Sequence, residues 1–195
     1  MVGGTFLHYV RVLRDRELPQ TQTSKAERDL LIKYLAGRKR IVEVGVFEGF
    51  TTRLFADYAD ADATIYGVDP FFRGRLGLSW GLRITSAYNR KHLRSGRVKL
   101  VRTCSIAVGN QVPEDVDFVF IDGDHSLEAV RDDWSFWSTR VMQGGVIGLH
   151  DTLLPLGAPK DAGFGSHQYF KSHIQQDPRF EIMDQQDSLS ILRKL

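Results

Sequence analysis

The chain alternates between short apolar segments and longer stretches in which apolar residues recur every three or four positions. Runs of Val, Ile and Phe between polar turns are typical of buried strands, and a spacing of three to four is typical of helices. Strand patterns separated by helix patterns predict an α/β fold with a doubly wound, Rossmann-like parallel sheet. The segments with the strand pattern are residues 41–46, 64–69, 98–101, 117–122 and 144–151.

The pattern changes near the C-terminal end, where residues 180–183 and 188–192 alternate around a turn at residues 184–187. Alternation on both sides of a short polar turn predicts an antiparallel hairpin. The expected sheet therefore has seven strands, is mostly parallel, and ends in a C-terminal antiparallel hairpin.

Helices are predicted from the same periodicity and from the residues that begin or end helices. Residues 5–14 carry apolar side chains at helical spacing and predict a short amphipathic helix. Ser24 and Glu27 have the spacing of a capping box, which predicts a second helix that ends at Gly37. Further helices are expected after residue 49, at residues 82–93, after residue 125, and from a cap at Ser166 to about residue 176.

The first predicted strand leads into a glycine turn with the spacing Glu43-x-Gly45-x-x-x-Gly49, and a helix pattern follows. A strand, a glycine turn and a helix place a ligand over the strand ends and against a helix N-terminus. The dinucleotide fingerprint Gly-x-Gly-x-x-Gly needs a second glycine for the pyrophosphate, and Phe47 stands at that position. The turn therefore does not match the dinucleotide fingerprint, and a plain strand-to-helix turn has the same pattern.

Polar residues follow the other predicted strands. Asp69 ends the second strand 20 residues after Gly49, the separation at which α/β folds place a carboxylate on ribose hydroxyls. A carboxylate that merely caps a turn is the alternative. Since parallel strands end at one edge, all these groups are expected to converge on one rim. The other members of the rim are Glu43, Gly45, Cys104, Ser105, Asp122, His150 and Asp151.

Composition adds limits on compartment and domain number. The chain of 195 residues fits one domain, in which residues 1–39 form a helical lead-in and residues 40–195 the Rossmann-like core. Its net charge of +2 points to no particular partner. Cys104 is the single cysteine, so no disulfide forms within the chain and a reducing cytoplasm is expected. The N-terminal residues lack a signal-peptide pattern, and no apolar run reaches the length of a membrane span.

Charge is unevenly distributed. Residues 71–103 contain nine Lys or Arg and no Asp or Glu, whereas residues 114–133 contain eight acids and one Arg. Residues 71–81, rich in glycine and aromatic residues, are expected to be a loop. The basic segment is either a lid that attracts an anionic or polar substrate, with Arg73 and Arg75 at its tip, or a solvated face balanced by the acidic stretch.

Two further motifs carry a family resemblance. Residues 118–125 (Phe-Val-Phe-Ile-Asp-Gly-Asp-His) and 144–152 (Gly-Gly-Val-Ile-Gly-Leu-His-Asp-Thr), together with the glycine turn, resemble the class I S-adenosylmethionine (SAM) methyltransferases. The likeness is to the small O-methyltransferases of the methyltransferase family 24 type, which are related to catechol O-methyltransferase and to the sugar and antibiotic O-methyltransferases. It extends from residue 40 to the C-terminus and includes the terminal hairpin.

The resemblance implies a role for each residue on the rim. Gly45, Phe47 and Gly49 line the methionine part of SAM, with Glu43 beneath it, and Asp69 binds the ribose hydroxyls. Ser105 and Cys104 lie at the adenine edge. Asp122 contributes to the cofactor and catalytic sites, and with His150 and Asp151 it forms a tentative metal site. His125 stands where relatives place a catalytic lysine or histidine.

The expected reaction is methylation of a small-molecule hydroxyl, which must lose its proton near neutral pH. Two versions stay open. In the first, a divalent cation assists, which is Mg²⁺ if only the two carboxylates bind it, and Mn²⁺, Fe²⁺ or Zn²⁺ if His150 also binds. In the second, His125 acts alone as the base. His150 departs from the relatives, which puts the metal in doubt. The alternative for His125 is a residue near a helix N-cap, bonded to Asp122 or Asp124.

Three other classes of function share parts of the pattern. An NAD-dependent oxidoreductase fits the fold, but Phe47 and the terminal hairpin argue against it. A metal-dependent hydrolase would leave the glycine turn and Asp69 without a role; its ligands would be Asp122, Asp124, His125, His150 and Asp151. A nucleic-acid binder could use the basic segment with Trp80 and Tyr88, but the Asn-Pro-Pro-Tyr motif of base-methylating enzymes is absent. The expected partner is a polar or anionic small molecule, without membrane or nucleic acid, and a homodimer is left open.

Overall fold

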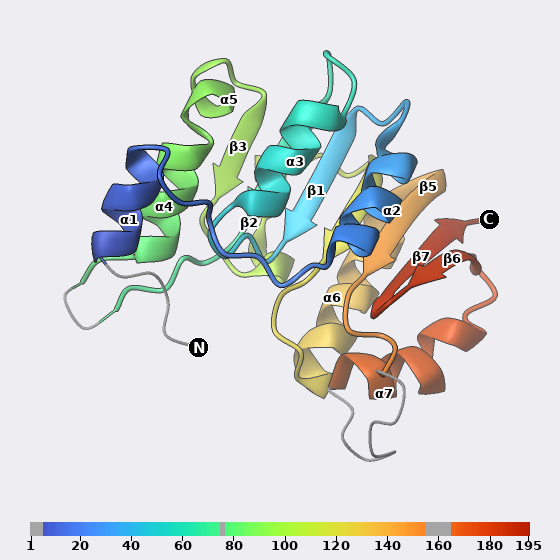
Figure 1. The fold of residues 1–195 in the computed structure, drawn as a ribbon. Helices are drawn as coiled ribbons and strands as arrows, with labels where there is room; N and C mark the ends of the chain where they lie inside the picture. The colour runs from blue at the N-terminus through green and yellow to red at the C-terminus, as the bar shows by residue number, and fades with distance from the viewer. Residues whose placement is uncertain (1–5, 75–76, 155–164) are drawn as a thin grey trace.

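The computed structural model describes residues 6–74, 77–154 and 165–195, and within them the strands form one seven-stranded sheet (Figure 1). The order across the sheet is β3-β2-β1-β4-β5-β7-β6, and the first five strands are parallel. The predicted α/β doubly wound fold is confirmed. The strands are β1 Arg40–Val44, β2 Thr64–Val68, β3 Val98–Val101, β4 Val116–Ile121, β5 Val141–Leu149, β6 Phe180–Gln186 and β7 Leu189–Lys194.

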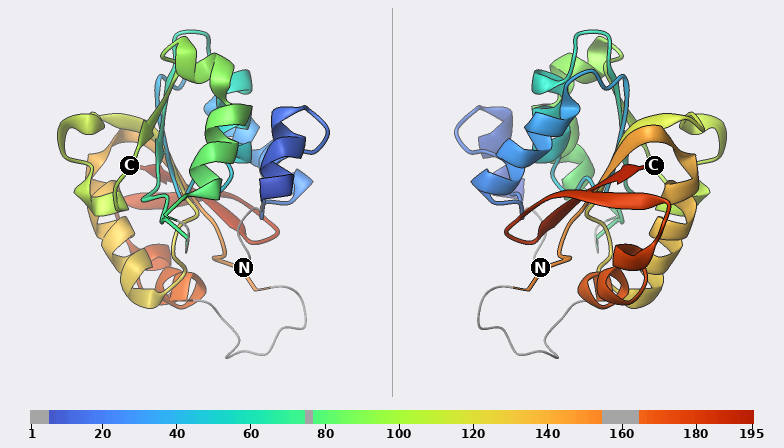
Figure 2. Two further views of the ribbon diagram at one scale, coloured as in Figure 1. Left: turned by 90° about the vertical axis from the view of Figure 1, so that its left-hand side faces the viewer. Right: turned by 90° about the vertical axis from the view of Figure 1, so that its right-hand side faces the viewer.

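Helices cover both faces of the sheet (Figure 2). One face is covered by α1 Phe6–Leu13, α2 Lys25–Leu35, α3 Phe50–Tyr58, α4 Trp80–Tyr88 and α5 Arg90–Arg94. The other carries α6 Leu127–Arg140 and α7 Gly165–Ser172. Three short 3₁₀ turns, η1 Ser105–Ala107, η2 Gly109–Gln111 and η3 Ile174–Gln176, complete the elements of the described residues.

Each face has its own apolar core because successive side chains of a strand point to opposite faces. Ile41 of β1 packs in the cluster that contains Leu31 and Phe55 from α2 and α3. Its neighbour Val42 packs in the cluster that contains Trp137 of α6. Strand β4 is buried at every position, as a central parallel strand must be.

The C-terminal hairpin is present, and β7 inserts between β5 and β6, antiparallel to both. The turn is shorter than predicted, because β6 continues to Gln186 and the chain reverses at Asp187 and Ser188. Asp187 adopts a left-handed φ of 51°, which suits a tight hairpin turn.

Three other predicted boundaries differ. The helix expected at residues 82–93 is divided at Asn89, whose buried side chain donates to the carbonyl oxygen of Gly49 at 2.9 Å. Strand β5 begins at Val141 instead of residue 144. Ser166 lies inside α7, and its hydroxyl donates to the Asp151 carbonyl oxygen at 2.9 Å instead of capping the helix.

The N-terminal residues pack on the same face as the core helices. Phe6 and Tyr9 of α1 contact the ring of Trp80 in α4 with centroids 5.8 and 5.9 Å apart. The proposed division into a lead-in and a core therefore stays a prediction. Within the three described ranges, none of the helices combines the length and apolar character that crossing a membrane requires.

Candidate functional site

The turn between β1 and α3 is shaped by its glycines. Gly45 has a φ of 88°, and a Cβ at this position would lie 2.1 Å from the carbonyl oxygen of Asp122. Gly49 has a φ of 78° at the N-cap of α3, where a Cβ would lie 2.7 Å from the Thr85 side chain. Both positions therefore require glycine. Phe47 also adopts a left-handed φ, of 55°, at the position where the dinucleotide fingerprint has glycine.

Asp69 holds this turn against the end of β2. Its Oδ2 accepts the backbone N–H groups of Val46 and Phe47 at 3.0 and 3.1 Å. Its Oδ1 accepts the N–H of Phe71 at 2.6 Å. The carboxylate thus fixes the turn and still lines the cavity described next. The prediction that it binds ribose hydroxyls stays a prediction.

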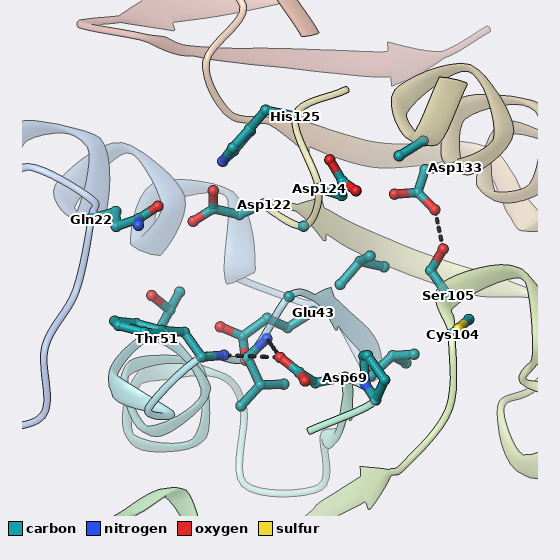
Figure 3. A pocket seen from close by; sticks show the side chains of 18 of the residues that line it. Gln22, Glu43, Thr51, Asp69, Cys104, Ser105, Asp122, Asp124, His125 and Asp133 are labelled. Carbon is teal, nitrogen blue, oxygen red and sulfur yellow. Dashed lines mark hydrogen bonds between the residues drawn. The ribbon is translucent and has the colours of Figure 1, made fainter. Parts of the chain in front are cut away.

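A cavity of about 510 Å³ opens over the carboxyl ends of the strands (Figure 3). That volume falls within the range of small-molecule and cofactor sites. The rim residues that line it are Glu43, Gly45, Phe47, Asp69, Cys104, Ser105, Asp122 and His125. Gly49, His150 and Asp151 are not among its lining residues.

Glu43 lies beneath the cavity with 1% of its surface exposed. Its carboxyl accepts the hydroxyl of Thr52 from α3. Burial raises the pKa of Glu43 well above its ordinary value, and the nearby charges of Asp122 and Asp69 act in the same direction. Burial at this position therefore favours the protonated form of Glu43 over the charged one.

His125 follows β4 and points into the cavity (Figure 3). Its Nδ1 lies 3.5 Å from Oδ2 of Asp151, and the side chain is one quarter exposed. Asp151 lies two residues after the end of β5 and adopts a left-handed φ of 53°, a conformation that non-glycine residues rarely adopt. The geometry thus places His125 beside Asp151, and the alternative considered from sequence, a bond to Asp122 or Asp124, stays a prediction.

His150 is buried between carboxylates from three elements. Its Nδ1 lies 3.0 Å from Asp122 Oδ1 and 3.6 Å from Asp151 Oδ1. Its Nε2 lies 3.4 Å from Oε2 of Glu27 in α2. Burial alone would lower the pKa of His150, but the bonds to Asp122 and Glu27 and the charge of Asp151 outweigh it and raise the pKa to about 10. The ring is therefore an imidazolium at neutral pH.

This arrangement bears on the tentative metal site. In the described ranges, no group of three or more His, Cys, Asp or Glu side chains could hold a metal ion. Metal ligation requires a deprotonated imidazole, and His150 directs a positive ring at both carboxylates. The three residues together do not fit a cation. A cation held by Asp122 and Asp151 alone remains an untested prediction.

Several lining residues were not singled out as site residues from the sequence. Asp133 of α6 is 5% exposed and accepts the hydroxyl of Ser105. The sequence did not indicate that Asp133 lines the cavity, because the helix pattern around Trp134 does not show which loop covers the helix. Burial raises the pKa of Asp133 to about 6, opposed by the Ser105 hydrogen bond and reinforced by Asp132 and Asp124.

The N-terminal segment also reaches the cavity through Gln20, Thr21 and Gln22. It is held by Glu48, a fully buried residue of the glycine turn. Oε2 of Glu48 lies 2.8 Å from Nε2 of His8 in α1 and accepts the N–H of Gln20 at 2.6 Å. The polar residues 20–22 therefore form one wall of the cavity.

The basic segment has several structural contacts. Arg97 donates to the carbonyl oxygens of Ala56, Ala59 and Ala61 around the end of α3. Arg73 lines a separate hollow that also includes Arg83. Phe72 is 80% exposed and lines the cavity over the strand ends. Arg75 and residues 155–164 lie outside the described residues.

Comparisons with known proteins agree with this geometry. A family model described as a methyltransferase domain matches residues 42–152, more than half of the chain. An uncharacterised protein of Sinorhizobium fredii, y4gI, is 27% identical over 138 residues, which cover 68% of this chain. The matched region spans only 14% of that relative's length.

Solved structures share the fold. A protein from Corynebacterium glutamicum has a TM-score of 0.71 at 17% identity, over 99% of this chain and 92% of its own. An O-methyltransferase from Bacillus cereus, solved with S-adenosylhomocysteine (SAH), has a TM-score of 0.63 at 17% identity, covering 97% and 89%. An rRNA methylase from Streptococcus thermophilus has a TM-score of 0.60 at 17% identity, covering 87% and 94%.

Proposed function

Because the chain belongs to the methyltransferase-domain family, we propose that it is a SAM-dependent methyltransferase acting on a hydroxyl group of a small molecule. One observation carries the proposal: the glycine turn, Asp69 and His125 lie around a single cavity. The turn and Asp69 bind a nucleoside cofactor that has no pyrophosphate, because Phe47 stands where the dinucleotide fingerprint needs its second glycine. His125 supplies a proton acceptor in the same cavity.

In this proposal the cofactor lies across the strand ends. Its methionine part rests on Gly45 and Phe47 near the N-terminal end of α3, above the carboxyl of Glu43, while Gly49 shapes the turn at the N-cap of that helix. Asp69 accepts the ribose hydroxyls while it continues to hold the turn. Cys104 and Ser105 border the base.

The reaction forms a bond between the acceptor oxygen and the methyl carbon and breaks the bond between that carbon and the sulfonium sulfur. The sulfur leaves as a neutral thioether, and the hydroxyl proton must go to a base. His125 lies beside Asp151, and in this proposal its imidazole takes the proton. Asp151 orients the ring and stabilises the imidazolium that forms.

Between the two versions of the mechanism, the surroundings of His150 favour the one without a metal. Its ring already provides a positive charge beside Asp122 and Asp151. A cation bound to both carboxylates would lie close to that charge and be repelled. We expect EDTA to leave turnover unchanged. Loss of turnover with EDTA, and recovery with Mg²⁺ or Mn²⁺, would instead support the two-carboxylate metal site.

Cofactor binding is tested by calorimetry with SAM and SAH. The native protein should bind both, and Asp69→Ala should lose about 1.5–3 kcal/mol of binding free energy, the value of a hydrogen bond to a charged group. Asp57→Ala is the matched control, because Asp57 ends α3 on the surface and does not line the cavity. A native protein that ignores SAM but binds NAD would overturn the proposal.

The base is tested by His125→Ala. Turnover should fall about 10²- to 10⁴-fold, the usual contribution of a general base, with SAH binding unchanged. The acceptor for this assay comes from a screen of small phenols, sugars and hydroxy acids with SAM. His173→Ala is the control, since that ring stacks on Tyr169 and lines a different hollow. Normal turnover of His125→Ala would remove His125 from the mechanism.

A further inference from the structure

A hollow lies between α1, α4 and the chain that follows β2, apart from the cavity over the strand ends. Figure 1 shows α1 beside α4, where the ring of Tyr9 contacts that of Trp80 with centroids 5.9 Å apart. The hollow has a volume of about 550 Å³, within the range of small-molecule sites. None of the described residues that line it is an Asp or a Glu.

Three arginines from separate parts of the chain line this hollow. Arg73 follows β2, Arg83 lies in α4, and Arg102 directly follows β3. All three are exposed. Positive charges gathered at one hollow repel one another and attract an anion, so the arrangement requires a counter-charge from the protein or from a ligand.

The protein does not supply that counter-charge. In the three described ranges, no salt bridge joins a Lys or Arg of residues 71–103 to an acid. Arg53 of α3 shows the contrast, because it pairs with Asp57 at 2.7 Å. The acidic residues 114–133 have other contacts: Asp117, for example, accepts backbone N–H groups at the start of β1 at 2.8 and 3.0 Å.

The other lining residues indicate what kind of anion fits. Tyr9 and Ser86 add hydroxyl groups, and Leu13 and Leu82 add apolar surface that can contact an organic group. A guanidinium presents its N–H donors as a planar fork that matches two oxygens of one phosphate. A phosphate group has enough oxygens to contact more than one such fork, so the hollow fits a phosphate ester with a small organic part.

We propose that this hollow binds a small phosphorylated molecule, with Arg73, Arg83 and Arg102 contacting its phosphate oxygens. The hollow is a second site, because Phe72 lines the cavity over the strand ends whereas Arg73 lines the hollow. An occupant contacts α1, α4 and the residue next to the cavity wall at the same time. The proposal depends on neither the methyl donor nor the reaction.

The experiment measures binding of inorganic pyrophosphate by calorimetry, without divalent cations and at physiological ionic strength. Arg83→Ala should weaken binding by at least about tenfold, the loss of one hydrogen bond between charged groups. Arg83→Lys keeps the charge without the planar fork and should recover part of the affinity. Arg90→Ala is the matched control, because it removes the same charge from an exposed position of α5 outside the hollow and should keep the native affinity.

A second measurement uses the native protein and needs no variant. Pyrophosphate should slow the modification of Arg73, Arg83 and Arg102 by phenylglyoxal, read by mass spectrometry of peptides, and should leave Arg90 and Arg94 unprotected. Equal protection of all five, or no binding of pyrophosphate, would overturn the site. So would a single-stranded RNA oligonucleotide that binds and protects all five when pyrophosphate protects none, since this would indicate an extended nucleic-acid surface.

Binding of SAH separates this proposal from the proposed function. The native protein and Arg83→Ala should bind SAH equally, because Arg83 does not line the cavity over the strand ends. Loss of SAH binding in Arg83→Ala would show that the hollow is not a separate site. A protein that binds pyrophosphate at these arginines but does not bind SAH would contradict the proposed function alone.

Discussion

Gly45 and Gly37 share a left-handed backbone conformation but differ in what surrounds them. A Cβ on Gly45 would collide with the Asp122 carbonyl group at 2.1 Å, whereas a Cβ on Gly37 would meet no atom within 4 Å. Gly37→Ala should therefore cost only the backbone strain of about 1–2 kcal/mol. Gly45→Ala should cost several times more and abolish SAH binding, because β1 and β4 must move apart. Thermal unfolding and calorimetry of both variants check this, and similar stabilities for the two would contradict it.

A single buried acid also has a measurable pH signature. Because the pKa of Asp133 is raised to about 6 from 3.8, the folded protein holds this proton more tightly than the unfolded chain does. Ionisation therefore costs stability, which should fall as the pH rises from about 4 to 6. Asp133→Asn should remove this contribution from the pH profile of unfolding, and Asp132→Asn should retain most of it, because burial is the largest cause of the raised pKa. Identical profiles for native protein and Asp133→Asn would show that the carboxyl titrates normally.

At the scale of elements, one carboxylate joins the start of α2 to the C-terminal hairpin. Glu27 completes the capping box by accepting the N–H of Ser24 at 2.7 Å, and it also accepts the N–H of Ser188 at 3.0 Å. It pairs with His150 at 3.4 Å. Burial would raise the pKa of Glu27, but hydrogen bonds from His150, Ser24 and Ser188 lower it to about 2. Glu27, which the sequence indicates only as part of a local capping box, therefore also makes long-range contacts with the hairpin and with His150.

Glu27→Gln should destabilise the protein by about 3 kcal/mol or more, since it leaves a buried imidazolium without one of its partners. Asp29→Asn, on the same helix in an exposed pair with Lys25, should change stability by less than about 0.5 kcal/mol. Denaturant unfolding at pH 7 compares them. Equal effects would show that the contacts of Glu27 contribute no more than a surface pair.

The same pair predicts how stability depends on pH. The low pKa of Glu27 adds stability above pH 4.5, and this is lost as the pH falls toward 2. The raised pKa of His150 adds stability below pH 6.5, and this is lost as the pH rises toward 10. Glu27→Gln should weaken both dependences, and a profile that matches the native one at both ends would contradict the pairing.

For the whole molecule, the N-terminal segment is attached to the cofactor turn by the contact between His8 and Glu48. Burial would lower the pKa of His8, but Glu48 and Glu17 raise it. The contact is therefore strongest below pH 6.5 and weakens as the pH rises through the raised pKa. Since Gln20 to Gln22 line the cavity, loss of this contact should loosen one wall of the site.

His8→Ala should lower stability by about 3 kcal/mol, because Glu48 stays buried without its imidazole partner. It should also weaken SAH binding and speed hydrogen exchange of the α1 amides. Arg11→Ala is the control on the same helix, since its exposed side chain lies 3.6 Å from Glu17. Unchanged exchange in α1 would show that its aromatic contacts with α4 suffice to hold it.

The sequence alone determined the order of elements, the parallel sheet, the hairpin, and the rim on which Glu43, Asp69 and Asp122 meet, although His150 and Asp151, also expected there, do not line the cavity. These follow from local periodicity and from the rule that parallel strands end at one edge. Two boundaries were not predicted from the sequence. The single helix expected at residues 82–93 is divided into α4 and α5 where Asn89 donates to Gly49, and β6 continues past the start of the expected turn.

Only the tertiary structure decided which polar groups are buried and what they face. His150 lies against three carboxylates from separate elements, Asp133 lies under η1, and His8 reaches Glu48 forty positions along the chain. These contacts join residues distant in sequence, and burial sets both their charge state and their strength. A periodic pattern shows that a residue faces the core or the solvent, but it does not show its partner.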